Sequence, residues 1–340
     1  MCLPINVELG DWYVTKKNTP LVSICCLTYN HARFIQQCME GFLEQTADFP
    51  FEIIVHDDAS TDGTVDILQS YAEDHPQVVK LVLQSDNQYA QGNGFVGLKL
   101  LFTQAQGKYI AYCEGDDYWA DTCKLQKQIE FLEEHPEYVL TYHNAKTIDE
   151  LGRSFHYEGA KSDDVVRPSS RADFSPEELK VGDQHIATLT ICFRNIFKMI
   201  DYPEELCRSA NGDTFLFSLL GNYGAGKYMG DQIQPAMNRI HNGGVWSLKP
   251  RREQLRMLAL TYNQLTTFYT RSSDRESAYH FREKSFMVLK ALLVESVRSG
   301  TRRELVGAYR AYCLIGCRHL AASIKLNAKV WLRLLTSLRA

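Results

Sequence analysis

Short apolar runs alternate with segments of helical periodicity through the first part of the chain, and this alternation constrains the fold more than any other feature. The runs occupy residues 21–27, 51–56, 78–83 and 109–113. Between them, apolar residues recur three or four positions apart, as in segments 31–45 and 95–106. Continuous apolar runs are typical of strands buried on both faces. Strands that alternate with helices predict an α/β fold, with a doubly wound, mostly parallel sheet flanked by helices.

The pattern continues less regularly to about residue 247. We expect a helix from 122 to about 135, strands over 138–143 and 186–194, and a helix that begins over 214–220. Residues 152–178 are polar and are expected to form a long loop over the active-site face. From about Pro250 the periodicity is helical. We therefore expect an N-terminal extension (1–19), an α/β domain (20–247) and an α-helical C-terminal extension (248–340).

Charge is distributed unevenly, although the net charge is only −4. Residues 248–340 hold 18 Lys and Arg against six Asp and Glu, whereas the residues before them hold 19 and 35. An acidic body fits chemistry with cations or sugars, and a basic tail fits contact with an anionic surface. A solvated basic helix face is the alternative explanation for the tail.

The sequence indicates neither a secretion signal nor a membrane span. Residues 1–18 lack a basic segment followed by an apolar one, and no stretch reaches the roughly 18 apolar residues of a spanning helix. The ten cysteines are scattered and lack the paired spacing of a zinc site. We therefore expect thiols rather than disulfides, and a cytoplasmic protein.

Polar and acidic residues follow three of the predicted strands. They are Thr28-Tyr29-Asn30, Asp57-Asp58 and Glu114-Gly115-Asp116-Asp117. In parallel α/β sheets, ligands bind beyond the carboxyl ends of the strands. Carboxylates gathered there repel one another unless a positive group lies among them, and a divalent cation that bridges to a diphosphate is the simplest such group. A carboxylate can also accept hydrogen bonds from a ribose or a pyrimidine N–H, which needs no metal.

These three segments, in this order and each at a strand end, resemble glycosyltransferase family 2, the large inverting family with the GT-A fold. The resemblance covers residues 20–247. It implies transfer of a sugar from a nucleotide-diphosphate donor, expected to be a UDP-sugar, to a hydroxyl of a glycan or lipid-linked saccharide. It also implies a role in surface polysaccharide biosynthesis and assistance by Mn²⁺ or Mg²⁺.

The resemblance assigns a set of residues to the nucleotide. They are Leu27, Thr28, Tyr29, Asp57, Asp58, Lys99 and Glu114. Asp58 is expected to bind the uracil-type base, with Asp57 supporting its turn. Glu114 takes the first position of the D-x-D motif, where Asp is usual, and is expected to face the ribose. Lys99 stands where relatives often carry Asn and is expected to approach the diphosphate.

The resemblance also implies a metal site. Asp116, at the last position of D-x-D, is the expected ligand, and Asp117 is expected to help with the metal or the donor sugar. Residues 239–247 resemble the closing segment of the family, so His241 is expected at the metal or diphosphate and Arg239 at the phosphate charge. Taken alone, a His-Asn-Gly-Gly turn is ordinary loop chemistry.

An inverting transfer needs a base that takes the proton of the acceptor hydroxyl. Asp213 stands just before an apolar helix and is similar to the acid of the family's helix motif, which makes it the candidate base. An N-cap that satisfies helix amides is the alternative role, and the two are compatible. His185, with Gln184 and Thr188, is expected to border the acceptor pocket.

The last segment, residues 323–340, carries apolar residues with Trp331 on one helical face and basic residues on the other. This pattern predicts a helix that contacts the inner membrane face, while packing against protein is the alternative. Two other functions stay open: a metal-dependent nucleotidyltransferase, and an inactive carbohydrate-binding protein with the GT-A fold. The absence of glycine from residues 28–33 disfavours the first. Intact acids at 58, 116 and 213 disfavour the second, and no nucleic-acid partner is expected.

Overall fold

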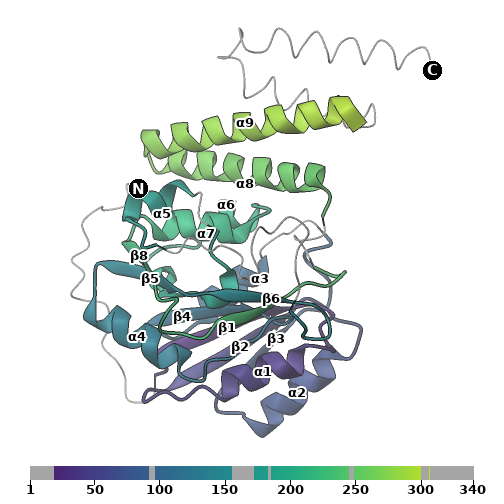
Figure 1. Cartoon of the computed structure of the whole chain (residues 1–340), viewed down its shortest axis with the longest axis vertical. Helices are drawn as coiled ribbons and strands as arrows, with labels where there is room; N and C mark the ends of the chain where they lie inside the picture. The colour runs from purple at the N-terminus through teal and green to yellow at the C-terminus, as the bar shows by residue number, and fades with distance from the viewer. Residues whose placement is uncertain are drawn as a thin grey trace. The chain divides into compact units, whose positions relative to one another are not determined.

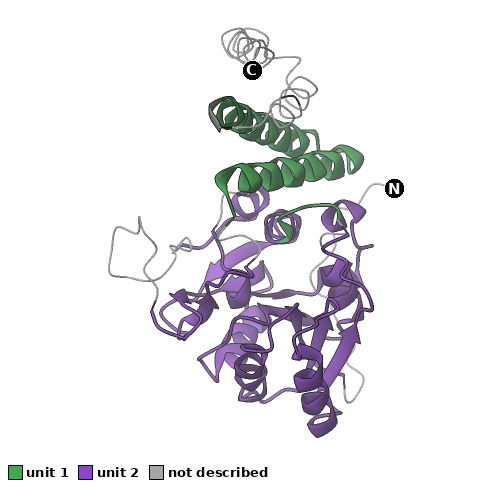
Figure 2. Ribbon diagram, turned by 90° about the vertical axis from the view of Figure 1, so that its right-hand side faces the viewer, with its two compact units in different colours: residues 1–3, 208–212, 245–340 green, residues 4–207, 213–244 purple. Residues whose placement is uncertain are grey.

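A computed structural model describes residues 19–91, 96–154, 172–182, 185–244 and 249–299, together with Val306. The chain divides into two compact units (Figure 2). The sheet unit comprises residues 4–207 and 213–244, and the helical unit comprises residues 1–3, 208–212 and 245–340. The predicted helix over 323–340 lies outside the described residues, as do most of the N-terminal extension and residues 155–171 of the expected loop.

A seven-stranded sheet forms the centre of the sheet unit, and its order is β3-β2-β1-β4-β7-β5-β8 (Figure 1). The strands are β1 (Val22–Thr28), β2 (Phe51–Asp57), β3 (Val79–Leu83), β4 (Tyr109–Glu114), β5 (Tyr138–Tyr142), β7 (Cys192–Arg194) and β8 (Ala225–Tyr228). Only β7 is antiparallel to its neighbours, β4 and β5. The mostly parallel sheet confirms the predicted fold class.

Register brings the carboxyl ends of three strands to the same level. Leu27 pairs with His56 of β2 and with Glu114 of β4, and Thr28 pairs with Asp57. The polar segments that follow β1, β2 and β4 therefore emerge at one edge of the sheet, as the sequence predicted.

Helices cover both faces of this sheet because successive strand residues point to opposite sides. The helices of the sheet unit are α1 (Ile35–Leu43), α2 (Thr64–Asp74), α3 (Val96–Gln104), α4 (Lys124–Glu134), α5 (Pro176–Val181), α6 (Glu204–Cys207) and α7 (Gly212–Leu220), whose first residue belongs to the helical unit. The core on one face includes Ile24 of β1 and Phe42 of α1. On the other face, Phe102 of α3 packs edge-on against Tyr112 of β4.

Two short strands form a second, parallel sheet that the sequence analysis missed. They are β6 (Ala145–Ile148) and β9 (Ala236–Arg239), paired in register from Ala145 with Ala236 to Ile148 with Arg239. Strands of four residues with mixed composition show no clear alternation. This sheet matters for function because the chain leaves β9 directly into His241.

The strand expected over residues 186–194 is wrong for most of its length. Residues Thr188–Thr190 form a 3₁₀ turn, η1, and only Cys192–Arg194 pair as β7; a second 3₁₀ turn, η2 (Ile196–Lys198), follows. The hydroxyl of Thr190 donates to the carbonyl of Ala187 at 2.7 Å. Such local side-chain bonds compete with strand pairing.

The expected loop 152–178 also ends in a helix, α5. Ser175 caps it and exchanges hydrogen bonds with Glu178, and a proline begins the helix. This capping box was readable in the sequence.

The helical unit contains α8 (Arg251–Arg271) and α9 (Arg275–Ser299), which run side by side (Figure 1). The ring of Phe281 stacks on Tyr269 at 5.6 Å between centroids, and the hydroxyl of Thr261 accepts from the backbone of Ala210 and Asn211. Within the described ranges, no helix is both long and apolar enough to cross a bilayer. The seven cysteines in those ranges are thiols, as expected.

Candidate active site

The turn after β1 is tied to the turn after β2 by four hydrogen bonds. They join Asn30 N to Ser60 Oγ (2.8 Å), Thr61 N to Asn30 Oδ1 (2.8 Å), His31 N to Thr64 Oγ1 (2.9 Å) and Ala32 N to Asp62 Oδ2 (3.0 Å). Asn30 adopts a left-handed conformation with φ of 55°, which Asn tolerates better than most residues. The two motifs that the sequence singled out thus form one frame, and this frame fixes the backbone of His31.

Asp57 and Asp58 are both buried, and both carboxylates accept backbone hydrogen bonds. Asp57 accepts from the amide and hydroxyl of Ser60, at 2.8 and 2.5 Å. Asp58 accepts from the amides of Gln88 and Tyr89, at 2.8 and 3.0 Å. Asp57 therefore closes its own turn, while Asp58 holds the segment after β3 against the end of β2.

Helix α3 approaches the ends of β1 and β2 closely because it has glycine at position 97. A Cβ there would lie 2.7 Å from Leu27 Cδ2 and 3.0 Å from the ring of His56. Both ring nitrogens of His56 and the hydroxyl of Thr28 are buried with no hydrogen-bond partner in the described part of the chain. Burial lowers the pKa of His56 although Asp58 and Asp57 act in the opposite direction. Unmatched polar groups at a strand end are typical of a ligand site.

Two further residues expected at the nucleotide are exposed. Tyr29 follows Thr28 with 43% of its surface accessible. Lys99 lies two residues beyond Gly97 on α3, and its side chain faces solvent.

Glu114 ends β4 and faces η1 and α7. The Thr188 hydroxyl lies 2.9 Å from both of its carboxylate oxygens. Burial and the charge of Asp116 raise the pKa of Glu114 to about 7, while the Thr188 hydrogen bond lowers it and the charge of Asp213 adds to the rise. Asp213 is therefore close enough for its charge to affect the pKa of Glu114. His185, three residues before Thr188, is exposed.

Asp213 lies in the first turn of α7 and is half-buried. Its Oδ1 accepts from the amide of Thr214 at 2.6 Å. The structure thus places this acid at a helix start, as the sequence predicted, on the side of Glu114.

Asp116, His241 and His31 form a cluster at the end of β4. Their ligand atoms all lie within 4.8 Å of one another. Nε2 of His241 is 2.8 Å from Asp116 Oδ2, and Nε2 of His31 is 3.9 Å from the same oxygen. Burial alone would raise the pKa of Asp116, but the hydrogen bond from His241 and the charges of both histidines lower it below its usual value. One carboxylate and two imidazoles are a donor set that holds divalent cations.

Asp117 turns away from this cluster toward β9. Its carboxylate accepts from Arg239 N at 2.7 Å and from Asn238 Nδ2 at 3.1 Å. Burial and the charges of Asp116 and Glu114 raise its pKa well above the usual range. Asp117 therefore joins β9 to the end of β4.

The guanidinium of Arg239 reinforces the same junction. Nε donates to the carbonyl of Asp116 at 3.0 Å, Nη1 to the carbonyl of Asp149 at 3.2 Å, and Nη2 to Gln37 Oε1 at 2.8 Å. The group also lies over the ring of Phe34, 4.7 Å from its centroid. Arg239 thus binds four segments of the sheet unit together immediately before His241.

His31 is the site residue that the sequence analysis missed. Its signal was its position directly after Thr28-Tyr29-Asn30 at a strand end. Only the folded turn places it beside two residues from distant parts of the chain.

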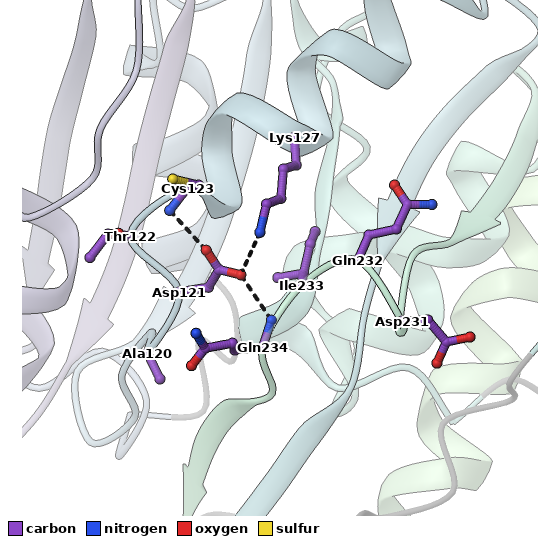
Figure 3. A pocket seen from close by; sticks show the side chains of 9 residues that line it. All are labelled: Ala120, Asp121, Thr122, Cys123, Lys127, Asp231, Gln232, Ile233 and Gln234. Atoms are coloured by element: carbon purple, nitrogen blue, oxygen red, sulfur yellow. Dashed lines mark hydrogen bonds and ion pairs between the residues drawn. The ribbon is translucent and has the colours of Figure 1, made fainter.

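A surface recess of about 630 Å³ is lined by other residues than those of the site (Figure 3). It is lined by residues 120–123, Lys127 and residues 231–234. Asp121, its central acid, accepts from Lys127 Nζ at 2.8 Å and from the amides of Cys123 and Gln234, each at 2.9 Å. These bonds lower the pKa of Asp121 against the effect of its burial. Asp121 and Lys127 of the recess already pair with each other, and no acid of the cluster lines it.

Comparison with known proteins gives matches by sequence and by structure. The sequence model of glycosyl transferase family 2 matches residues 23–201, more than half of the 340 residues. An uncharacterised protein of Mycobacterium tuberculosis is 35% identical over 185 residues, which are 54% of this chain and 50% of the relative. The chain thus spans about half the length of the curated relatives that it matches first.

Two further matches bear on fold and chemistry. The UDP-Glc:alpha-D-GlcNAc-diphosphoundecaprenol beta-1,3-glucosyltransferase WfaP of Escherichia coli is 37% identical over 116 residues, 33% of this chain and 41% of that protein. The crystal structure of S. aureus TarS 1-349 in complex with UDP-GlcNAc has a TM-score of 0.60 and 17% identity, over 92% of this chain and 89% of that one. The structural match confirms the expected GT-A-like fold.

Proposed function

The chain belongs to glycosyltransferase family 2, and from this premise we propose that it transfers a sugar from a nucleotide-diphosphate donor to a hydroxyl of a glycan or lipid-linked saccharide. One observation carries the proposal. Glu114 and Asp116 stand at the end of β4 with two imidazoles beside Asp116 and a second acid, Asp213, beside Glu114. An inverting transfer needs both groups: one that stabilises the charge of the leaving diphosphate, and, on the other side, a base for the acceptor hydroxyl.

The nucleotide is proposed to lie over the ends of β1 and β2. Leu27, Thr28 and Tyr29 line the end of β1, and the buried Thr28 hydroxyl offers an unused hydrogen-bonding group. Asp58 would accept from the base while it holds the segment after β3. Uridine is favoured because WfaP, a relative by sequence, is named for a UDP-sugar. Exposed Lys99 is proposed to approach the diphosphate and His185 to border the acceptor.

The cluster at Asp116 is proposed to hold Mn²⁺ or Mg²⁺. Its residues fit a divalent cation, because a half-buried carboxylate and a histidine nitrogen 2.8 Å from it offer ligand atoms at the expected end of the sheet. When bound, the cation supplies positive charge to the leaving diphosphate. Asp117 and Arg239 contribute by fixing β9, and thereby His241, opposite Asp116.

Asp213 is proposed to take the proton of the acceptor hydroxyl as that oxygen attacks the anomeric carbon. The backbone amide of Thr214 donates to its Oδ1 at 2.6 Å and orients the carboxylate. Asp213 is held by a helix start rather than by a long loop, so its position is defined before the acceptor binds.

The wider setting is proposed to be surface polysaccharide biosynthesis at the inner membrane face, with the segment 323–340 as the membrane contact. The name of the relative WfaP, which includes a diphosphoundecaprenol-linked sugar, supports this acceptor class. The uneven charge of the chain supports an anionic surface as the partner of the C-terminal extension.

A panel of nucleotide-sugars tests the function. The full-length chain should hydrolyse one donor slowly in Mn²⁺ or Mg²⁺ and lose that activity in chelator. Asp213→Asn should keep donor affinity and lower transfer by about 10²–10⁴-fold, the usual contribution of a positioned base. If no donor is consumed with or without metal, the inactive binding protein is the better description. If donor affinity falls together with rate, Asp213 is structural and another group is the base.

A further inference from the structure

We propose that His31 is a third protein ligand of the divalent cation and that it makes the site select a transition metal such as Mn²⁺ over Mg²⁺. The inference rests on the proposed function in that it concerns the same cation site. It goes beyond that function because it names His31, in the turn after β1, as a metal ligand, and because it gives the site a preference for Mn²⁺ over Mg²⁺.

Position is the first support. His31 comes from the turn after β1, Asp116 from the turn after β4 and His241 from the segment after β9, yet their ligand atoms lie within 4.8 Å of one another. The two imidazole rings are nearly perpendicular with centroids 5.7 Å apart, so they do not stack, and Nε2 of each ring lies within 3.9 Å of Asp116 Oδ2. Three ligand atoms this close can share one cation after small rotations of the side chains.

The partners of His31 are the second support. Its backbone amide donates to Thr64 Oγ1, so the main chain is fixed. Its Nδ1 is buried with no partner among the residues described, and its Nε2 stands 3.9 Å from Asp116 Oδ2, beyond hydrogen-bond distance. What distinguishes His31 is that its ring combines an unmatched buried Nδ1 with an Nε2 that lies near a carboxylate without bonding to it, and an ion between the two side chains accounts for this arrangement.

The chemistry of the donor set gives the preference. Mg²⁺ is a hard cation that binds oxygen ligands in octahedral geometry and retains water. Imidazole nitrogen suits transition metals, and although Mn²⁺ binds it more weakly than the later metals do, Mn²⁺ accepts nitrogen more readily than the hard Mg²⁺ ion, so two imidazoles with one carboxylate discriminate between these two cations. Asp116 with His241 alone would offer one nitrogen, and His31 adds a second. The structure therefore favours Mn²⁺ more strongly than the D-x-D motif does by itself.

The experiment titrates Mn²⁺ and Mg²⁺ separately into the full-length apo protein without nucleotide. Bound Mn²⁺ is followed by loss of the free-ion electron paramagnetic resonance signal, and nitrogen couplings in the bound-ion spectrum report its imidazole ligands. Three variants are compared with the wild type. His31→Ala removes the ligand, His31→Asp replaces nitrogen with oxygen, and His75→Ala removes an exposed histidine at the end of α2 as the matched control.

We expect His31→Ala to weaken Mn²⁺ binding by at least about 10–100-fold, the range seen even for groups that only orient ligands. The bound-ion spectrum should lose one nitrogen ligand, and Mg²⁺ affinity should change far less. His31→Asp should recover part of the Mn²⁺ affinity and reduce the preference for Mn²⁺ over Mg²⁺. His75→Ala should behave as the wild type. Melting curves of the apo variants check that each one folds, and the recovery in His31→Asp is a result that a structural role would not produce.

The proposal is overturned if His31→Ala binds Mn²⁺ as the wild type does, or if the wild type shows one nitrogen ligand. Equal wild-type affinity for Mn²⁺ and Mg²⁺ overturns the preference. These outcomes are independent of sugar transfer. A protein that binds Mn²⁺ through His31 but consumes no donor would refute the proposed function and keep this inference, and an active enzyme with unchanged metal binding in His31→Ala would do the reverse.

Discussion

Replacing Arg239 with lysine separates two roles for this residue: a bond between segments of the sheet unit, and a contact to phosphate. The guanidinium donates to the carbonyls of Asp116 and Asp149 and to the side chain of Gln37, and only 6% of the residue is exposed. Lysine keeps the charge but offers one nitrogen, which can reach one of these oxygens at most. Two hydrogen bonds from a charged donor would therefore be lost.

The size of the loss follows from these bonds. A hydrogen bond to a charged group contributes about 1.5–3 kcal/mol net, so losing two predicts a decrease in the free energy of unfolding of about 3–6 kcal/mol. The weaker cation–π contact with Phe34 adds up to about 1 kcal/mol. Ordinary domains have a stability of roughly 5–15 kcal/mol, so the variant either stays folded with a measurably lower stability or is unfolded already in buffer, and circular dichroism distinguishes the two.

Urea unfolding followed by circular dichroism gives the stability, and calorimetric titration gives the affinities for Mn²⁺ and UDP. Mn²⁺ affinity should fall about 10–100-fold, because His241 loses the support of β9. The matched control is Arg33→Lys, whose ion pair with Glu150 at 2.7 Å is largely exposed and should cost about 1 kcal/mol or less. A phosphate role predicts weaker UDP binding with unchanged stability. If Arg239→Lys costs no more than Arg33→Lys, the structural role is refuted.

Three other changes test separate parts of the molecule. Asp58→Ala should weaken UDP binding by about 1–3 kcal/mol in calorimetric titration; equal affinity would remove its role at the base. Gly97→Ala should destabilise the fold by about 1–3 kcal/mol and weaken UDP binding, because the added Cβ meets Leu27 2.7 Å away; unchanged values in both assays would contradict this packing. Burial lowers the pKa of Lys124 to about 8 in the folded state, so the unfolded state binds more protons above pH 8 and stability rises with pH there. In urea unfolding, the free energy of unfolding of the wild type minus that of Lys124→Met should therefore increase by about 1 kcal/mol from pH 7 to pH 9. A difference that does not change with pH would contradict this pKa.

The first four strands were predictable because each corresponds to a largely apolar run, although only β1, β2 and β4 are buried along most of their length and the edge strand β3 is partly exposed. β1 begins one residue later and ends one residue later than the predicted 21–27, and β2 extends the predicted 51–56 by one residue. Their register then forces the polar segments to one edge. The α/β class and the general location of the site were therefore determined by local patterns.

The remainder depends on contacts between distant segments. β9 has four residues of mixed character, and only its pairing with β6 gives it a place in the fold. The Thr188 hydroxyl was expected in a strand but lies on a 3₁₀ turn against Glu114. His31 became a site residue only when the turn after β1 was placed beside the segment after β9. No local periodicity carries such information.

The acids at the strand ends divide into two groups according to whether their carboxylates accept hydrogen bonds from backbone amides that tie segments of the fold together. Asp57, Asp58 and Asp117 accept from backbone amides at 2.7–3.0 Å, so their carboxylate oxygens already have hydrogen-bond donors within the fold. The other acids at this edge are Glu114, Asp116 and Asp213. Glu114 has a pKa raised to about 7, which relieves repulsion within that second group. Asp116 differs from the other acids because its neighbours are imidazoles, and a metal ion could bind between them and the carboxylate. We therefore propose one cation at Asp116 and infer no second one from the other carboxylates of the motifs.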